Sequence, residues 1–265
     1  MKDFRSERKL LPDDVFLVPG DGKRPKPTDM ISQDSWNGIV HLPDDVALTT
    51  SGHHGRQLNA LYTLWADWIT ATGDDQDALF VPMLDAGDCF QSCTFDALHG
   101  YYRSALANLR SALELVAIGA LGMFAPADEA YLRWKQSDEG SSLTFPSCYK
   151  RLQGTSQVPL GRLLKEQRGW IERFYYKLCD YAHSRPDSSD GEMWKSNGPI
   201  YVGHVMNDVF RLEVSTYATC YILATLGRKT LLVPKDSAFI FETPEILWCE
   251  AIIPAYNAAR ATVTE

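Results

Sequence analysis

Apolar side chains recur at intervals of three and four along most of the chain after residue 50, the spacing that gathers them on one face of an α-helix. The clearest case runs through Tyr102, Leu106, Leu109, Leu113 and Val116. The same spacing predicts helices at residues 55–72, 85–124, 128–136, 160–183, 202–226 and 244–260. With about five or six helices and no internal repeat, the sequence predicts a mainly α fold, a helical bundle.

The first fifty residues lack this periodicity and carry the prolines Pro12, Pro19, Pro25, Pro27 and Pro43, which break long elements. We therefore expect residues 1–50 to form an irregular N-terminal arm, with short β segments at 15–18 and 38–42, packed on a single helical domain at 51–265. Further short strands at 230–233 and 238–241 fit a β-hairpin near the C-terminus. Turn-forming residues predict irregular structure at 137–159 and a loop at 185–199.

Composition narrows the class of protein. The 265 residues carry a formal net charge of -8, which argues against a broad cationic surface for nucleic acid but allows a small basic cleft. The most apolar stretches, 105–125 and 200–227, contain charged residues such as Arg110 and Glu213, so we expect no membrane span. The charged N-terminus lacks the apolar run of a signal peptide, so we expect a cytoplasmic protein.

Several common catalytic patterns are absent from the sequence. It contains no Gly-x-Gly-x-x-Gly or P-loop pattern, no Gly-x-Ser-x-Gly elbow and no His-Glu-x-x-His. The six cysteines are scattered, and the pair Cys89 and Cys93 has no second pair at similar spacing, so we expect reduced thiols and no metal site. We expect no cofactor.

Two predicted helices carry polar side chains on one stripe each. On the first, Arg103, Arg110 and Glu114 follow helical spacing; on the second, Asp180 and His183 do, with Lys177 and Arg185 close in sequence. If the two helices pack together, these groups converge. A histidine suits general acid–base catalysis and guanidinium groups stabilise negative charge on phosphate, so the set contains the ingredients for metal-independent phosphodiester cleavage.

The same residues fit a purely structural role. Charges at a helix interface form ion-pair networks that fix how the helices pack, and a histidine at a helix C-terminus is favoured by the helix dipole. The sequence leaves both interpretations open.

Two runs of sequence carry a family resemblance. The run 100–114, Gly-Tyr-Tyr-Arg-Ser-Ala followed by Leu-Arg-Ser-x-x-Glu, and the run 178–184, Leu-Cys-Asp-Tyr-Ala-His-Ser, resemble the two signature helices of uncharacterised bacterial helical proteins related to the HEPN superfamily. The resemblance spans about residues 85–184. His183 matches the histidine of the HEPN motif, whereas Lys177 stands six residues before it, where the family has arginine.

The resemblance implies a helical bundle, a homodimer, and a metal-independent endoribonuclease or toxin-type effector of toxin–antitoxin and anti-phage defence systems. RNA is then the expected substrate, and an antitoxin or regulatory protein a further partner. The residues implicated in catalysis are His183, Lys177, Asp180, Arg110 and Glu114, and those in substrate binding are Arg103 and Arg185.

The departure at Lys177 keeps a second class of function open, because lysine lacks the bidentate fork of arginine. This alternative is a non-catalytic interaction or regulatory subunit, in which the same charges are structural. A third class, a small-molecule enzyme with an interhelical aromatic pocket, has no specific support in the sequence.

Two further pairs of residues have a functional and a structural interpretation. His53 and His54 could bind a metal or an anion, or could be exposed polar residues at the start of a helix. Trp65 and Trp68 could be a stacking platform for nucleic-acid bases, or core aromatics at helical spacing.

Overall fold

The structure is a computed structural model that describes residues 31–73, 77–136, 142–154, 168–182 and 198–228. Every regular element in these residues is helical, which confirms the predicted α-helical bundle. The elements are α1 (Gln33–Trp36), η2 (Asn37–His41, a π-helix), α2 (Leu42–Thr72), α3 (Phe80–Leu98), α4 (Tyr102–Phe124), α5 (Glu129–Lys135), α6 (Phe145–Gly154), α8 (Arg168–Ala182) and α9 (Gly203–Gly227).

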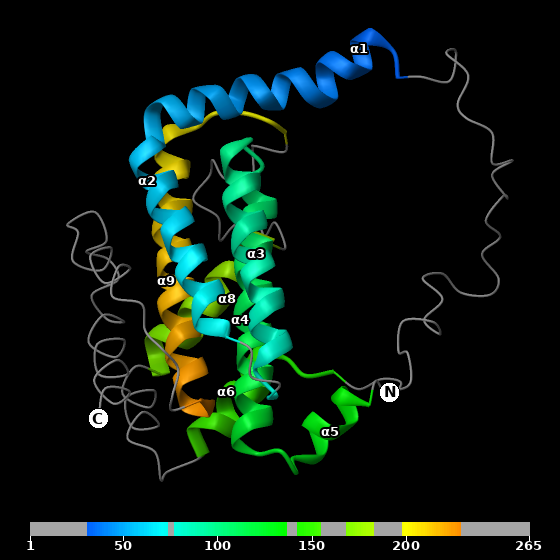
Figure 1. Ribbon diagram of the computed structural model, residues 1–265, viewed down its shortest axis with the longest axis vertical. Coiled ribbons are helices and arrows are strands. Elements are labelled where there is room, and N and C mark those ends of the chain that lie inside the picture. The colour runs from blue at the N-terminus through cyan, green and yellow to red at the C-terminus, as the bar shows by residue number, and fades with distance from the viewer. Residues whose placement is uncertain (1–30, 74–76, 137–141, 155–167, 183–197, 229–265) are drawn as a thin grey trace, which may run out of the picture.

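Helix α4 lies at the centre of the bundle (Figure 1). It packs against α3, α9, α8 and α6, while α2 covers α3 and α9. The sequence of α4 suits this position, because the residues from Val116 to Gly122 are all buried, including those that would face water in a surface helix.

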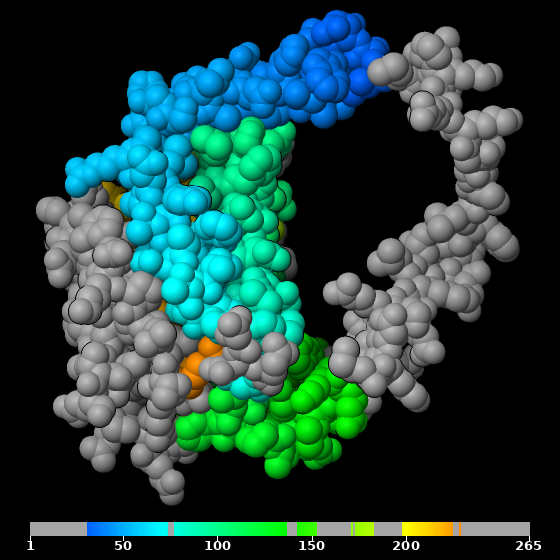
Figure 2. Space-filling model, viewed as in Figure 1, coloured from blue at the N-terminus to red at the C-terminus, as the bar shows by residue number. Residues whose placement is uncertain are grey.

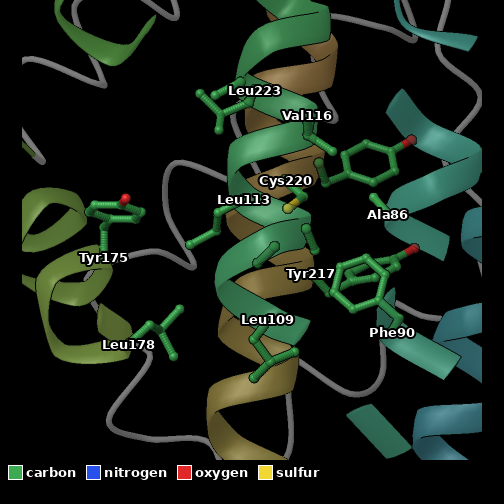
Figure 3. Close-up of a cluster of buried hydrophobic side chains, with 14 of the residues drawn as sticks. Ala86, Phe90, Leu109, Leu113, Val116, Tyr175, Leu178, Tyr217, Cys220 and Leu223 are labelled. Atoms are coloured by element: carbon green, nitrogen blue, oxygen red, sulfur yellow. The ribbon is translucent and has the colours of Figure 1, made fainter. Parts of the chain in front are cut away.

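Two groups of buried side chains lie on opposite sides of α4 (Figure 3). On one side lie Phe90 of α3 and Tyr217 of α9. Both rings form edge-to-face contacts with Trp68 of α2, at centroid distances of 5.4 and 5.6 Å. On the other side Tyr175 and Leu178 extend from α8 toward α4. The apolar periodicity of each helix is therefore explained by burial against α4 or its neighbours.

Helix α4 is also long and apolar enough to cross a membrane by length and composition. However, 61% of its most apolar window is buried inside the bundle. Such burial is typical of the core helix of a soluble protein, and it supports the expectation that this chain does not use α4 as a membrane span.

The start of α4 is fixed to the start of α9. Gly100 has φ 80°, and a Cβ atom there would lie 2.3 Å from the backbone oxygen of Ile200. The hydroxyl of Tyr102 accepts a hydrogen bond from the Val202 N–H at 3.0 Å. Glycine is required at position 100 because it allows both the left-handed backbone and the close approach.

The opposite end of the bundle is held by Arg228. Its guanidinium donates to both carboxylate oxygens of Asp77, at 2.7 and 2.8 Å, and to the backbone oxygen of Thr72 at 2.8 Å. Burial alone would raise the pKa of Asp77, but the hydrogen bonds and charge of Arg228 lower it. This contact joins the ends of α2 and α9 to the start of α3.

The prediction of irregular structure through residue 50 is wrong for the residues described. Residues 33–50 are helical, and the strand expected at 38–42 lies within η2 and the start of α2. Ser32 caps α1 by accepting a hydrogen bond from the Ser35 N–H, and Pro43 lies in the first turn of α2, where proline fits. Helix α2 crosses the end of the bundle and then turns down its side at His54, where the backbone is non-helical (Figures 1 and 2).

Three other features differ from the prediction. The single helix expected at 85–124 is two helices, α3 and α4, separated at Gly100, whose φ is 80°. Residues 145–154, expected to be irregular, form α6, because Phe145, Cys148, Tyr149 and Leu152 share one buried face. Helix α3 begins at Phe80, before the expected position, since Pro82 is accommodated within its first turn. The strands expected at 15–18, 230–233 and 238–241, the helix at 244–260 and the start of the helix expected from 160 lie outside the described residues.

Candidate functional site

The most developed polar cluster predicted from the sequence lies where α4 meets α8. Glu114 accepts hydrogen bonds from the Nε and Nη2 of Arg110, at 3.2 and 3.1 Å, one helical turn earlier on α4. The same oxygen of Glu114 accepts a hydrogen bond from the Tyr175 hydroxyl at 2.6 Å. The side chains of Arg110 and Glu114 are 27% and 26% exposed, so solvent reaches this charge pair.

Local helical geometry explains how this cluster forms. Arg110 and Glu114 are four residues apart and therefore lie on the same face of α4. Tyr175 reaches that face because Leu178 and Phe174, its neighbours on α8, are buried against the core. Glu114 and Tyr175, which are 61 residues apart in the sequence, thus meet because apolar side chains pack around their contact.

The environment keeps Tyr175 in its protonated, donating form. Burial raises the pKa of Tyr175, and the hydrogen bond to Glu114 raises it further. Cys179, one turn later on α8, also lies close enough to raise the pKa of Tyr175 and to interact with Arg110. Figure 3 shows that the two helices run antiparallel here, since Tyr175 lies beside Leu113 and the later Leu178 lies beside the earlier Leu109.

The other predicted residues on these helices occupy different positions. Arg103 lies two turns before Arg110 on α4 and is half-buried. Lys177 lies 4.8 Å from the ring centroid of Tyr181, a cation–π contact along α8. Helical geometry places Lys177 about 200° around α8 from Tyr175, and Asp180 about 140° from it. The structure thus joins Arg110 and Glu114 to α8 through Tyr175.

His183 and Arg185, expected in catalysis and in substrate binding, lie outside the described residues. Helix α8 is described as far as Ala182, the residue immediately before His183. The positions of these two side chains relative to Arg110 and Glu114 therefore stay predictions.

The arrangement supports two chemical roles. Glu114 and Tyr175 hold the Arg110 guanidinium at the α4–α8 contact, where it could bind an anionic group. The same contacts are also those of an ion-pair network that fixes helix packing. In the described part of the chain, no group of three or more His, Cys, Asp and Glu side chains could hold a metal ion.

The sequence interpretation overlooked Tyr175. Tyr175 is buried, whereas its neighbour Tyr176 is exposed. One signal was available: Tyr175 precedes Leu178 by three residues, so it shares the apolar face of the helix. An aromatic hydroxyl on an apolar face needs a polar partner, and Glu114 provides it.

The histidine pair lies in the middle of α2, at its kink, and is not at a helix start as expected. His54 is buried; its Nδ1 lies 2.5 Å from Oε1 of Gln57 and its Nε2 lies 3.1 Å from the Tyr201 hydroxyl. His53 is exposed and its ring stacks on Tyr201 with centroids 5.3 Å apart. Gln57 also donates to Asn207 at 2.9 Å, so this network joins the α2 kink to the start of α9.

The burial of the two tryptophans decides between a stacking platform and core aromatics. Trp68 is 0% exposed and its Nε1 donates to the Met83 backbone oxygen at 2.7 Å, which confirms it as a core aromatic. Trp65 is partly buried and packs against the same core. The described cysteines are free thiols, and Cys93, Cys148 and Cys220 are buried, in agreement with the expectation.

Comparison of the chain with protein-family models, with curated proteins and with solved structures finds no match. Any function must therefore be argued from the residues and geometry of this chain.

Proposed function

We propose that this protein is a metal-independent, HEPN-like endoribonuclease whose site lies at the α4–α8 contact. The observation that carries the proposal is the hydrogen bond from Tyr175 to Glu114, which attaches the Arg110–Glu114 pair to the helix that leads directly to His183. The pair is partly open to solvent, as a site for a polymeric substrate must be.

The antiparallel register supports the placement of the remaining residues. Glu114 is hydrogen-bonded to Tyr175, and Leu178 lies beside Leu109, so each turn toward the start of α4 corresponds to a turn toward the end of α8. The described end of α8, at Ala182, therefore lies toward the turns of α4 that carry Arg110 and Arg103.

The proposed chemistry uses these groups in separate roles. His183 accepts the proton of a ribose 2′-hydroxyl, whose oxygen forms a bond to the adjacent phosphorus while the bond from phosphorus to the 5′-oxygen breaks. The leaving 5′-oxygen takes up a proton. Arg110, oriented by Glu114, stabilises the added negative charge on the phosphoryl oxygens, and Arg103 and Arg185 bind neighbouring phosphates. Lys177 and Asp180 are more distant members of the site.

The proposal is tested by RNA cleavage in the presence of EDTA. We expect the wild-type protein to cleave, and His183→Ala to lose about 10²-fold or more of the rate, the usual contribution of a general acid–base group. His41→Ala, an exposed histidine on η2, is the matched control and should keep full activity. Equal cleavage by wild type and His183→Ala, or no cleavage of structured and unstructured RNAs by either, would contradict the proposal.

The helical segment from Gln33 to the kink of α2 at His54, called the α1–α2 arm below, favours a second candidate function, that of an interaction subunit. Ile39 and Leu48 on the arm are 64% and 70% exposed, and Trp36 and Leu42 are also exposed. Apolar side chains on a projecting helix are typical of protein contact surfaces. In this proposal the protein forms a homodimer or binds a regulatory protein through the arm. Light scattering of wild type against Ile39→Ser with Leu48→Ser tests the dimer, which the double variant should dissociate; a monomeric wild type would contradict it.

A further inference from the structure

A second carboxyl, which unlike Glu114 is buried, lies on the side of α4 away from the proposed site. Glu213 of α9 is only 3% exposed, and its Oε1 accepts a hydrogen bond from the Thr94 hydroxyl of α3 at 2.9 Å. Its other oxygen, Oε2, is fully buried, and no donor reaches it among the described residues. A buried carboxyl with one unsatisfied oxygen is costly in the ionised state.

The groups around Glu213 offer little compensation for a negative charge. From α3 the facing groups are Thr94 and the Cys93 thiol, and the next titratable group on that helix is Asp96, which accepts a hydrogen bond from Asn108 of α4. Within the described chain no cation from α2, α4 or α9 pairs with Glu213. Burial accordingly raises the pKa of Glu213 to about 8, and the weaker effects of Thr94 and Cys93 lower it.

The position of Glu213 connects it to the packing of the bundle. The hydrogen bond from Thr94 is a direct link between α3 and α9, which otherwise pack mainly through α4. One helical turn before Thr94 on α3 and one turn after Glu213 on α9, Phe90 and Tyr217 pack with Trp68. A charge at Glu213 would therefore draw water into a contact that adjoins the aromatic core.

We propose that Glu213 is a proton-binding switch: when protonated it holds α3 against α9, and when ionised it opens this contact. The switch is independent of the ribonuclease proposal, because it uses none of the same residues.

The direction of the pH dependence follows from proton linkage. An opened state exposes Glu213 to water, where its pKa returns to the ordinary value near 4.5, whereas in the closed state it is about 8. Between these values the closed state binds more protons, so rising pH favours opening, by up to about tenfold per pH unit. Above about pH 8 the effect levels off.

Alkylation of Cys93 measures this opening directly, because its thiol is fully buried in the closed state and lies beside Glu213. Full-length wild type and Glu213→Gln are treated with iodoacetamide from pH 6 to pH 9, and the modified cysteines are quantified by peptide mass spectrometry. Glutamine has the shape of the protonated acid. Dividing the Cys93 alkylation rate of wild type by that of Glu213→Gln at each pH therefore removes the effect of thiolate formation. We expect this ratio to rise at least tenfold from pH 6 to pH 8.

Three controls make the outcome specific. Asp208→Asn makes the same charge change at a half-exposed carboxylate of α9 and should follow wild type. Cys148 in α6 is also buried, and the ratio of its alkylation rates in wild type and Glu213→Gln should not rise in the same way. Thr94→Val removes a hydroxyl that favours the ionised form, and should move the transition to higher pH. A constant Cys93 ratio from pH 6 to pH 9, or an equal rise at Cys148 that indicates global unfolding, would overturn the proposal.

Discussion

Two glutamates on opposite sides of α4 show how the same side chain behaves in different surroundings. Glu114 faces α8, is partly exposed, and receives hydrogen bonds from Arg110 and Tyr175. Glu213 lies at the contact of α9 with α3, is buried, and receives one hydrogen bond from Thr94. The first carboxyl has a cation beside it and access to water, whereas burial raises the pKa of the second and favours its neutral form.

The helix contacts in this bundle therefore differ in how well they accommodate charge. The contact of α4 with α8 can carry charge and exchange it with solvent, which suits a site for an anionic substrate. The contact of α3 with α9 adjoins the aromatic core around Trp68, where charge destabilises the packing.

The largest effect is expected from the aromatic core next to Glu213. Trp68→Ala should lower the free energy of unfolding by about 3–5 kcal/mol, because it leaves a cavity and removes contacts with Phe90 and Tyr217. Urea unfolding at pH 7 measures the change. Trp36→Ala on the exposed arm is the control and should stay within about 0.5 kcal/mol of wild type. Equal losses of unfolding free energy in the two variants would show that Trp68 does not pack in the core.

The two glutamates should respond in opposite directions to the same substitution. At pH 8.5, Glu114→Gln should destabilise the protein by about 1–2 kcal/mol, because it removes the charge that pairs with Arg110. Glu213→Gln should stabilise it by about 1–3 kcal/mol, because glutamine avoids the buried charge. Urea unfolding of both variants tests the contrast. If both lose stability at this pH, the distinction between a charged and a neutral contact fails.

A smaller effect is expected for the hydroxyl that joins α8 to α4. Tyr175→Phe keeps the packed ring and removes the hydrogen bond to Glu114, so it should cost about 1–2 kcal/mol of stability. A double-mutant cycle with Glu114→Gln isolates the coupling between the two side chains. Tyr176→Phe, an exposed neighbour, should change stability by less than about 0.5 kcal/mol. Additive losses for Tyr175→Phe and Glu114→Gln would mean that the two groups do not interact.

The smallest effect on stability concerns Lys177. Its cation–π contact with Tyr181 lies along a single helix and is partly exposed, so Lys177→Met should cost only about 0.5–1 kcal/mol. In the RNA cleavage assay the same variant distinguishes a peripheral from a central role, since Lys177 lies on the other side of α8 from Tyr175. We expect an activity loss well below that of His183→Ala, and an equal loss would move the centre of the site toward Lys177.

Much of the fold could be predicted from apolar spacing. The helix expected at 202–226 is observed as Gly203–Gly227, and the apolar face from Tyr102 to Val116 is buried in α4. The prediction failed where local breakers were overruled. Pro43 and Pro82 suggested interruptions, but Pro82 lies in the first turn of α3, where the missing N–H has no intrahelical acceptor, and Pro43 directly follows the π-helical turn of η2 in a continuous helical run.

The candidate site was only partly predictable. Helical spacing was enough to place Arg110 and Glu114 on one stripe, since it depends on local geometry. It did not single out Tyr175 as their partner, because that contact depends on which turn of α8 lies beside which turn of α4. The burial of Glu213 was likewise hidden, although the residue was visible in the sequence as a charge within an apolar helix.

Local spacing and composition are enough to predict that the chain forms amphipathic and apolar helices, that these assemble into a bundle, and which charges share a helix face. The central place of α4, the contact of Tyr175 with Glu114 and the burial of Glu213 beside Thr94 depend instead on contacts between helices distant in sequence. The physical reason is that the state of a carboxyl depends on its neighbours and its access to water, and both are set by the packing of residues distant in sequence.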